Sequence, residues 1–248
     1  MGALDLYTLS WPEIRREIDA GRDTIVLCFG AVEQHGHHLP LGTDSMIGDD
    51  LGRLLADRLN AFQAPTVRVG CSRHHLAFPE TMSVEEETFQ SVVVDIVRGW
   101  AAHGFKRIVL LPTHGGNFGP LAGATERLGS LDGVKVVAIT DLSVLVEATL
   151  GLGGELGIPA NEGGLHAGEW ETSMMLALHP ELVHMDRAVA GYTGDLEEGL
   201  GRFFAEGVDA LTDTGVIGDP SQAAAENGRK YIERLVDLAA EMIERESA

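Results

Sequence analysis

Cysteine, aromatic residues, positive charge and long hydrophobic runs are all scarce in this sequence. Its 248 residues include only two cysteines, Cys28 and Cys71, and both lie in apolar stretches. Two cysteines are too few for a disulfide framework or a thiolate metal site, so a reducing cytoplasm is the simplest setting. No apolar run approaches the roughly 18 residues that a membrane span requires, and we therefore expect no membrane partner.

Positive charge is outweighed about two to one. Lysine and arginine total 18 against 38 for aspartate and glutamate, which gives a formal net charge of −20. A surface of this sign repels phosphate backbones and anionic membranes, so we expect no nucleic-acid partner. The sequence does contain 44% hydrophobic residues, enough for the core of one α/β domain over residues 1–248.

Short apolar runs alternate with helical patterns along the chain. Runs that are apolar on both faces are typical of a buried parallel sheet, and they predict strands at residues 24–29, 66–69, 107–111 and 134–139. Helices are predicted after the cap Ser10 and at residues 45–59, 84–103, 118–128 and 221–245. The glycine-rich residues 151–168 are expected to form a long functional loop. This alternation predicts a three-layer α/β/α sandwich with a mostly parallel central sheet.

Polar side chains follow two of the predicted strands directly. Glu33 and His35 come after the first strand, and side chains two apart on an extended segment project to the same side. Asp44 follows a turn that can fold back on them, and His114 follows the strand at 107–111. Parallel sheets carry their sites beyond the carboxyl ends of the strands, so these side chains are expected to converge.

A third polar group opens a helical pattern. His166 and Glu169 are three residues apart and point to the same side of a helix start, and Glu171 follows. Both glutamates also suit the helix dipole without any metal, and a lone His-Gly-Gly turn is commonly a plain strand-to-helix junction. However, three polar segments that each lie at the end of a strand or the start of a helix favour one shared site. Imidazole and carboxylate ligands suit zinc, manganese or iron(II).

Two further segments are candidates for binding substrate. The backbone amides of Gly115, Gly116 and Asn117 can stabilise an oxyanion, while a phosphate-binding role is weak because no Gly-Lys-Ser/Thr follows. His75, beside Arg73, belongs to a segment that presents positive charge to an anionic substrate or forms a solvated loop. Both interpretations of that segment remain open.

Taken in order, these motifs resemble the creatininase (creatinine amidohydrolase) family. The matching segments are GAVEQHGHH (30–38), TD (43–44), FPETMS (78–83), HGGN (114–117) and HAGEWETS (166–173). The resemblance implies a three-layer α/β/α fold, assembly as a homo-oligomer, often a hexamer, and two divalent metal ions per subunit. Glu80 stands where the family usually has glycine, which puts the shape of its loop in question.

The resemblance also assigns roles to individual residues. Glu33 and His114 would bind one ion, His35 would bind the other, and Asp44 would bridge the two. Creatinine-acting members have a glutamate ligand two residues after the histidine that corresponds to His114, and glycine stands there in this chain. We expect Glu169 to fill this vacancy. His166 matches the family's proton-shuttling histidine.

The activity implied is metal-dependent hydrolysis of a C–N bond in a small amide, lactam or formamide by an activated water. Creatinine itself is disfavoured, because Leu142 and Glu162 are the nearest equivalents of the tryptophans that creatinine-acting members carry. Two alternative functions remain: a peptide-trimming or cyclic ketone hydrolase of the same family, and a non-catalytic metal-binding module.

Overall fold

A parallel sheet of five strands forms the centre of the computed structural model, which describes residues 2–247. The strands follow the order β1-β3-β2-β4-β5, and every neighbouring pair is parallel. Their bounds are Leu4–Asp5 (β1), Thr24–Phe29 (β2), Phe62–Gln63 (β3), Arg107–Pro112 (β4) and Lys135–Ala138 (β5). The two longest strands, β2 and β4, are therefore neighbours at the middle of the sheet.

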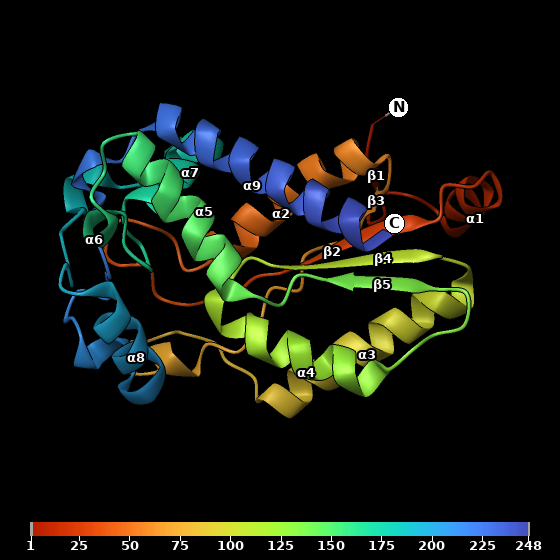
Figure 1. Ribbon diagram of the computed structural model, residues 1–248, viewed down its shortest axis with the longest axis horizontal. Coiled ribbons are helices and arrows are strands. Elements are labelled where there is room, and N and C mark those ends of the chain that lie inside the picture. Colours follow the sequence, from red (N-terminus) through yellow and green to blue (C-terminus); the bar gives the residue numbers. More distant parts are fainter. Residues whose placement is uncertain (1, 248) are drawn as a thin grey trace.

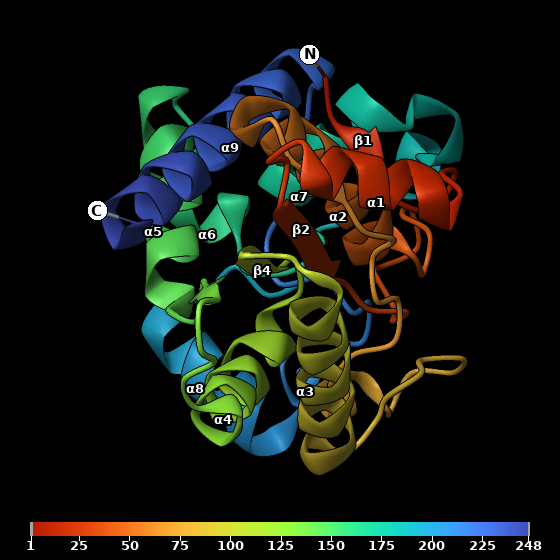
Figure 2. The ribbon, with the colours of Figure 1, turned by 90° about the vertical axis from the view of Figure 1, so that its right-hand side faces the viewer.

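Helices cover both faces of this sheet (Figures 1 and 2). One face carries α2 (Thr43–Leu59) and α9 (Ala225–Ser247), and the other carries α3 (Glu86–His103) and α4 (Phe118–Leu128). The predicted three-layer α/β/α sandwich with a parallel central sheet is thus confirmed.

The side chains of β2 divide between the two cores. Ile25, Leu27 and Phe29 pack toward α3 and α4, whereas Val26 and Cys28 pack toward α2 and α9. Successive side chains of a strand point to opposite faces of the sheet, so a strand between two helical layers needs apolar residues at every position. All six residues of β2 are buried, as the uninterrupted apolar run predicts.

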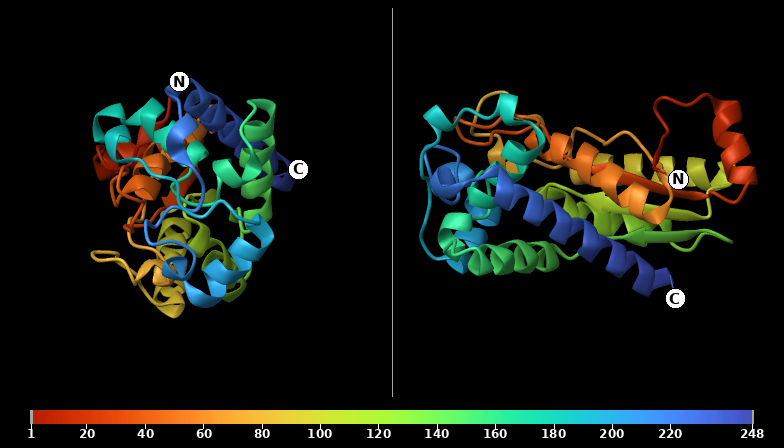
Figure 3. Two further views of the ribbon diagram at one scale, coloured as in Figure 1. Left: turned by 90° about the vertical axis from the view of Figure 1, so that its left-hand side faces the viewer. Right: turned by 90° about the horizontal axis from the view of Figure 1, so that it is seen from above.

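The remaining helices lie mostly toward the ends of the molecule. Figure 3 shows α1 (Trp11–Asp19) at one end, with α6 (Ala160–Gly163) and α8 (Leu196–Glu206) toward the other. The predicted capping box is present at α1, where Ser10 and Glu13 satisfy each other's backbone amides. Two more helices are α5 (Leu142–Glu155) and α7 (Glu169–Leu178). Short 3-10 turns occupy Arg73–His75, Gly115–Asn117, Pro180–Leu182, Met185–Arg187, Val208–Ala210 and Pro220–Gln222.

Two predicted elements are wrong. Residues 66–69 do not form a strand, because β3 lies earlier and Val67 makes only an isolated bridge with Phe29. Half of the supposed loop at 151–168 is helical, since α5 runs through Glu155 and α6 occupies Ala160–Gly163. Gly153 lies on the packed side of this part of α5, where an added Cβ would lie 3.2 Å from the Tyr231 hydroxyl, whereas a Cβ on Gly151 or Gly154 would meet nothing within 4 Å. There a small residue permits close packing rather than a turn.

The connections between strands determine where a site can form. The chain leaves β2 toward α2 on one face of the sheet and leaves the neighbouring β4 toward α4 on the other. Connections that depart in opposite directions open a crevice beyond the carboxyl ends of the two strands. The polar segments after Phe29 and Pro112 enter this crevice. Across residues 2–247, none of the helices is both long and apolar enough to cross a membrane.

Candidate metal centre

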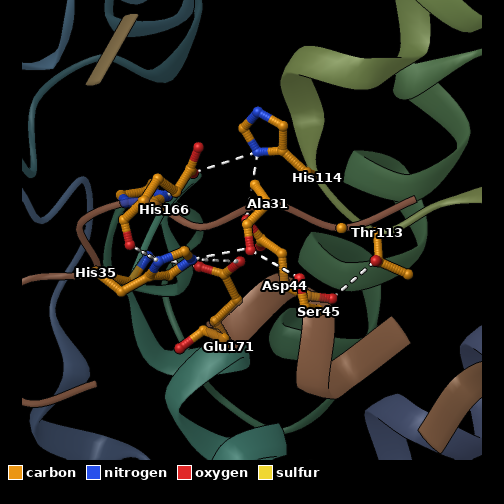
Figure 4. A network of polar contacts seen from close by, with 12 residues as sticks. Ala31, His35, Asp44, Ser45, Thr113, His114, His166 and Glu171 are labelled. Atoms are coloured by element: carbon orange, nitrogen blue, oxygen red, sulfur yellow. Dashed lines mark hydrogen bonds and ion pairs between the residues drawn. The ribbon is translucent and has the colours of Figure 1, made fainter. Parts of the chain in front are cut away.

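Carboxylates and imidazoles from four segments meet beyond the ends of β2 and β4. The His114 Nδ1 atom lies 3.2 Å from Glu33 Oε1 and 3.4 Å from Asp44 Oδ2. On the other side of Asp44, the Oδ1 atom lies 3.4 Å from His35 Nε2, which is also 3.8 Å from Glu171 Oε1. Figure 4 shows the side chains of Asp44, His35, His114 and Glu171 converging. Asp44 therefore faces a different histidine with each of its two oxygens.

The backbone fixes the orientation of both histidines. The Nδ1 atom of His35 lies 3.1 Å from the carbonyl oxygen of Glu33, and the Nε2 atom of His114 lies 3.2 Å from the carbonyl oxygen of Cys71. A ring nitrogen that faces a carbonyl oxygen carries the hydrogen and donates it. In the neutral rings the opposite nitrogens then present lone pairs to the carboxylates. This is the arrangement that usually orients histidine ligands toward a metal ion.

Buried polar atoms without hydrogen-bond partners mark the centre of the cluster. They include both carboxylate oxygens of Glu33, Oδ2 of Asp44, and Nε2 of His35 and His75. Burying such groups without partners is costly, and most proteins satisfy them. A divalent cation would satisfy the Glu33 and Asp44 oxygens and His35 Nε2, which are the donor types that zinc, manganese and iron accept. The residues present therefore fit a metal site.

The protonation tendencies of this cluster also favour positive charge at its centre. Burial alone would lower the pKa of His35, but the Asp44 and Glu171 carboxylates hold that pKa well above its ordinary value. Burial likewise opposes the charge on His114, yet Glu33 and Asp44 hold its pKa well above the ordinary range. Burial would raise the pKa of the Asp44 carboxyl, but His35 and His114 hold it well below its usual value. The Asp44 carboxylate thus stays ionised and attracts cations.

His166 lies beside the cluster in a different state. Its Nε2 atom donates a hydrogen bond of 2.7 Å to the carbonyl oxygen of Gln34, so the Nδ1 atom carries the lone pair. This Nδ1 atom lies 3.8 Å from Glu33 Oε1. Burial, reinforced by the charge on His35, lowers the pKa of His166 to about 4. The ring is therefore neutral near pH 7, with a free base site directed into the cluster.

His75 supports Glu33. The side-chain amide of Gln34 donates to His75 Nδ1 and to the carbonyl oxygen of Gly215, each at 3.0 Å. The hydrogen of His75 therefore sits on Nε2, which lies 3.3 Å from Glu33 Oε1. His75 was expected to bind substrate. In the structure it lines the cleft, but its polar contacts hold Gln34 and Glu33.

Glu169 does not join the cluster, contrary to expectation. Its carboxylate accepts hydrogen bonds from Ser173 at 2.8 Å, Asn227 at 2.9 Å and Tyr231 at 2.8 Å, all on the side of α7 that packs against α9. Residues two apart on a helix point about 200° away from one another, so Glu171 faces the opposite way. The Glu171 carboxylate accepts from the Ala167 backbone amide and approaches His35.

The turn after His114 supports the fold rather than presenting a row of groups to substrate. Asn117 accepts from the Cys71 amide at 2.9 Å and donates to the carbonyl oxygens of Phe29 and Gly30. Its side chain is therefore not free to bind substrate. A Cβ on Gly116 would lie 2.2 Å from the Cys71 carbonyl oxygen, so glycine is needed there for close packing. Of the three residues, Gly115 alone lines the cleft beside the cluster.

A narrow cleft opens onto the cluster. On one part of its surface lie Glu33, Asp44, His75, His114, His166 and Glu171, and the rest is mainly apolar. The apolar part comes chiefly from α5 and α8, and of their residues the sequence interpretation connected only Leu142 with substrate. The spacing of Leu200, Phe203 and Phe204 on α8 was an available signal, because residues three and four apart share a helix face.

Three groups of residues bring ligand atoms within 4.8 Å of one another: Glu33, His75 and His166; His35, His166 and Glu171; and Glu33, His35 and Asp44. Glu171 and Gln34 are the site residues that sequence reasoning missed. Glu171 was noticed only as a partner of the helix dipole. Nothing in the sequence distinguishes Gln34 from its neighbours, because its role depends on contacts with three distant segments.

Comparisons with known proteins agree with this geometry. A sequence profile for the family described as "Creatininase: Creatinine amidohydrolase" matches residues 7–243. The mycofactocin precursor peptide peptidase of Mycobacterium ulcerans is 34% identical over 223 residues, which cover 86% of this chain and 82% of that protein. The creatinine amidohydrolase of Pseudomonas putida is 32% identical over 198 residues, or 73% of this chain and 74% of the relative.

Solved creatininase structures share the fold over nearly the whole chain. A mutant described as Zn-Zn type superposes with a TM-score of 0.81 at 26% identity and covers 99% of both chains. A structure described as "Creatininase Mn" gives a TM-score of 0.82 at 26% identity and covers 98% of both. By sequence and by structure, the chain is a hydrolase of the creatininase family.

Proposed function

We propose that this protein uses two divalent metal ions to hydrolyse a C–N bond of an amide, lactam or formamide in a small molecule or short peptide. One observation carries the proposal: buried carboxylate and imidazole atoms without hydrogen-bond partners face one space beside a cleft. A closed structural site would have no reason to adjoin a cleft that reaches its ligands. The names of the relatives, a peptide peptidase and a creatinine amidohydrolase, support cleavage of C–N bonds.

The proposed ligands divide around Asp44. Glu33 and His114 would hold one ion, and His35 and Glu171 would hold the other. Asp44 is suited to bridge the two, because its oxygens face His35 and His114 separately. Glu171 takes the role that the sequence suggested for Glu169. Zinc, manganese and iron(II) all accept this ligand set, and creatininase structures are known in zinc and manganese forms.

Divalent cations in such a site lower the pKa of water and polarise a carbonyl group. The chain's own contribution is to move protons. His166 offers its Nδ1 lone pair as the general base, while the Gln34 carbonyl oxygen holds the ring at Nε2. The same Nδ1 atom can then pass the proton to the departing nitrogen, which is a poor leaving group without one. His75 and Gln34 keep Glu33 and His166 in position.

Metal removal and restoration test the proposal. Chelator-treated protein should lose hydrolysis of a panel of small amides, formamides, lactams and dipeptides. Activity should return on addition of zinc, manganese or iron(II), with two ions bound per chain by elemental analysis. A protein that binds metal but cleaves no member of a broad panel would instead be a metal-binding module, and this result would refute the proposed hydrolysis.

We further propose a homo-oligomer, by family resemblance a hexamer, built from one domain spanning residues 1–248 and located in the cytoplasm. The support is the resemblance together with the low cysteine content. Light scattering coupled to size-exclusion chromatography measures the assembly, and a single-chain mass in solution would contradict it.

A further inference from the structure

Part of the cleft lining comes from two helices outside the metal-ligand cluster. Leu200, Phe203 and Phe204 of α8 line the cleft at helical spacing of three and four residues. Leu142 and Val146 of α5 line it as well, four residues apart. The lining residues of α8 named here therefore present only carbon to the space beside the cluster, and on α5 the hydroxyl of Thr149, which also lines the cleft, is bonded to the Leu145 carbonyl oxygen.

This lining carries no fixed positive charge. Among the residues that the structure describes, the cleft includes Glu33, Asp44 and Glu171 but no lysine or arginine. Arg73, which the sequence offered as part of a positive patch, is exposed and lies outside the cleft lining. A negatively charged group bound against α5 and α8, away from the proposed metal ligands, would therefore meet apolar neighbours without a compensating lysine or arginine.

The aromatic part of the lining is built as a rigid unit. The Phe203 and Phe204 ring centroids lie 4.9 Å apart with an interplanar angle of 87°, and His74 contacts both rings at 5.2 and 5.1 Å. Such edge-to-face contacts are favourable and directional. Phe203 is 9% exposed, whereas Phe204 keeps 38% of its surface accessible. An exposed phenylalanine held in place at a cleft is a ready surface for another apolar group.

We propose that the substrate carries an uncharged aromatic or bulky aliphatic group beside the scissile C–N bond, and that Phe203, Phe204, Leu142 and Val146 bind this group. The inference rests on the proposed hydrolytic function and specifies its substrate class. The apolar group would gain by leaving water at these side chains, while the carbonyl group reaches the carboxylate and imidazole cluster. The four residues determine specificity and take no part in bond cleavage.

Titration calorimetry of the zinc-loaded protein tests the preference with matched ligands: acetohydroxamate, phenylacetohydroxamate and para-carboxyphenylacetohydroxamate. We expect phenylacetohydroxamate to bind about tenfold or more tightly than acetohydroxamate, and the carboxylated ligand to lose most of that gain. In the Phe204→Ala variant, the affinity ratio of phenylacetohydroxamate to acetohydroxamate should fall to about twofold or less. The matched control is Trp11→Ala, which removes an 80% exposed ring far from the cleft and should leave the ratio unchanged.

A second readout needs no metal. Ligand-observed NMR on metal-free protein should detect phenylacetamide but not acetamide, and Phe204→Ala should remove the signal. Equal affinities for all ligands, tightest binding of the carboxylated ligand, or an unchanged ratio in Phe204→Ala would each overturn the inference. Hydrolysis of amides is measured on the same samples. If the ratio holds and no amide is cleaved, the apolar site stands and the proposed catalytic function fails.

Discussion

The Tyr231 hydroxyl donates a hydrogen bond of 2.8 Å to Glu169 Oε2, and this bond joins α9 to α7. Ser173 and Asn227 donate to the other oxygen of the same carboxylate. A Cβ on Gly228 of α9 would lie 1.9 Å from the Ser173 carbonyl oxygen, so the two helices pack too closely there for any side chain. These contacts fix the rotation of α7, and with it the direction of Glu171.

Glu169→Ala is expected to reduce stability while leaving metal binding intact, because the close packing of Gly228 on Ser173 still orients α7 and Glu171. The substitution removes the shared acceptor of three side chains, and a buried donor without a partner costs about 1–3 kcal/mol. Urea unfolding should show this loss in the free energy of unfolding, and elemental analysis of the folded protein should show unchanged metal content. A selective loss of one ion in a protein of unchanged stability would place Glu169 among the ligands after all.

Glu171→Gln should have the opposite profile. An amide preserves the size of the side chain and retains an acceptor for the Ala167 backbone amide, so stability should change by less than about 1 kcal/mol. Replacing the charged oxygen near His35 should remove the ion that His35 binds. We expect elemental analysis to give one ion per chain where the unaltered protein holds two. Full retention of both ions would refute the assignment of Glu171.

Asp44→Ala should deprive the protein of both ions together. Each Asp44 oxygen faces a different histidine, so removal of this carboxylate affects both proposed positions. Asp50 provides a control on the same helix, since it is partly exposed and pairs with Arg53 and His179 instead. Asp50→Ala should keep the full metal content and activity. A full complement of metal in Asp44→Ala would mean that this residue does not bridge the ions.

His166→Ala should separate metal binding from turnover. Because the proposed ligands are other side chains, metal content should stay at the level of the unaltered protein. Loss of a general acid and base should lower kcat by about 100-fold to 10,000-fold. Added imidazole should restore part of the rate, which a purely structural defect would not allow. His179→Ala is the control, because His179 pairs with Asp50 away from the cleft. Near-normal kcat in His166→Ala would remove this histidine from the mechanism.

Local patterns in the sequence predicted much of the site. The position of Glu33 and His35 after a buried strand, and of His114 after its neighbour, placed these side chains at one edge of the sheet before any contact was known. The structure brings them together with Asp44 and His166. These features follow from strand direction and side-chain alternation, which depend on short stretches of chain.

The choice between Glu169 and Glu171 could not be made in this way. Both begin the same helix, and the side that faces the cluster is set by packing against α9, far along the chain. Ala167, which donates its backbone amide to Glu171, takes the left-handed conformation at φ 52°, which its residue type does not favour. Glu80 likewise adopts φ 69°, the region that favours the glycine usual in relatives, so the loop keeps a left-handed residue there despite the exchange.

Asn117→Ala is expected to test whether the turn after His114 binds substrate or supports the fold. The side chain makes three hydrogen bonds to the backbone, including those to the Cys71 amide at 2.9 Å and the Gly30 carbonyl oxygen at 3.0 Å. Their loss should lower the free energy of unfolding by about 1–3 kcal/mol. Below the unfolding transition, KM should stay within about twofold, because Asn117 is absent from the cleft lining that the structure describes. Asn161→Ala, which removes one exposed bond to Thr193, serves as the control and should alter neither quantity. A large rise in KM with unchanged stability would return Asn117 to the substrate-binding residues.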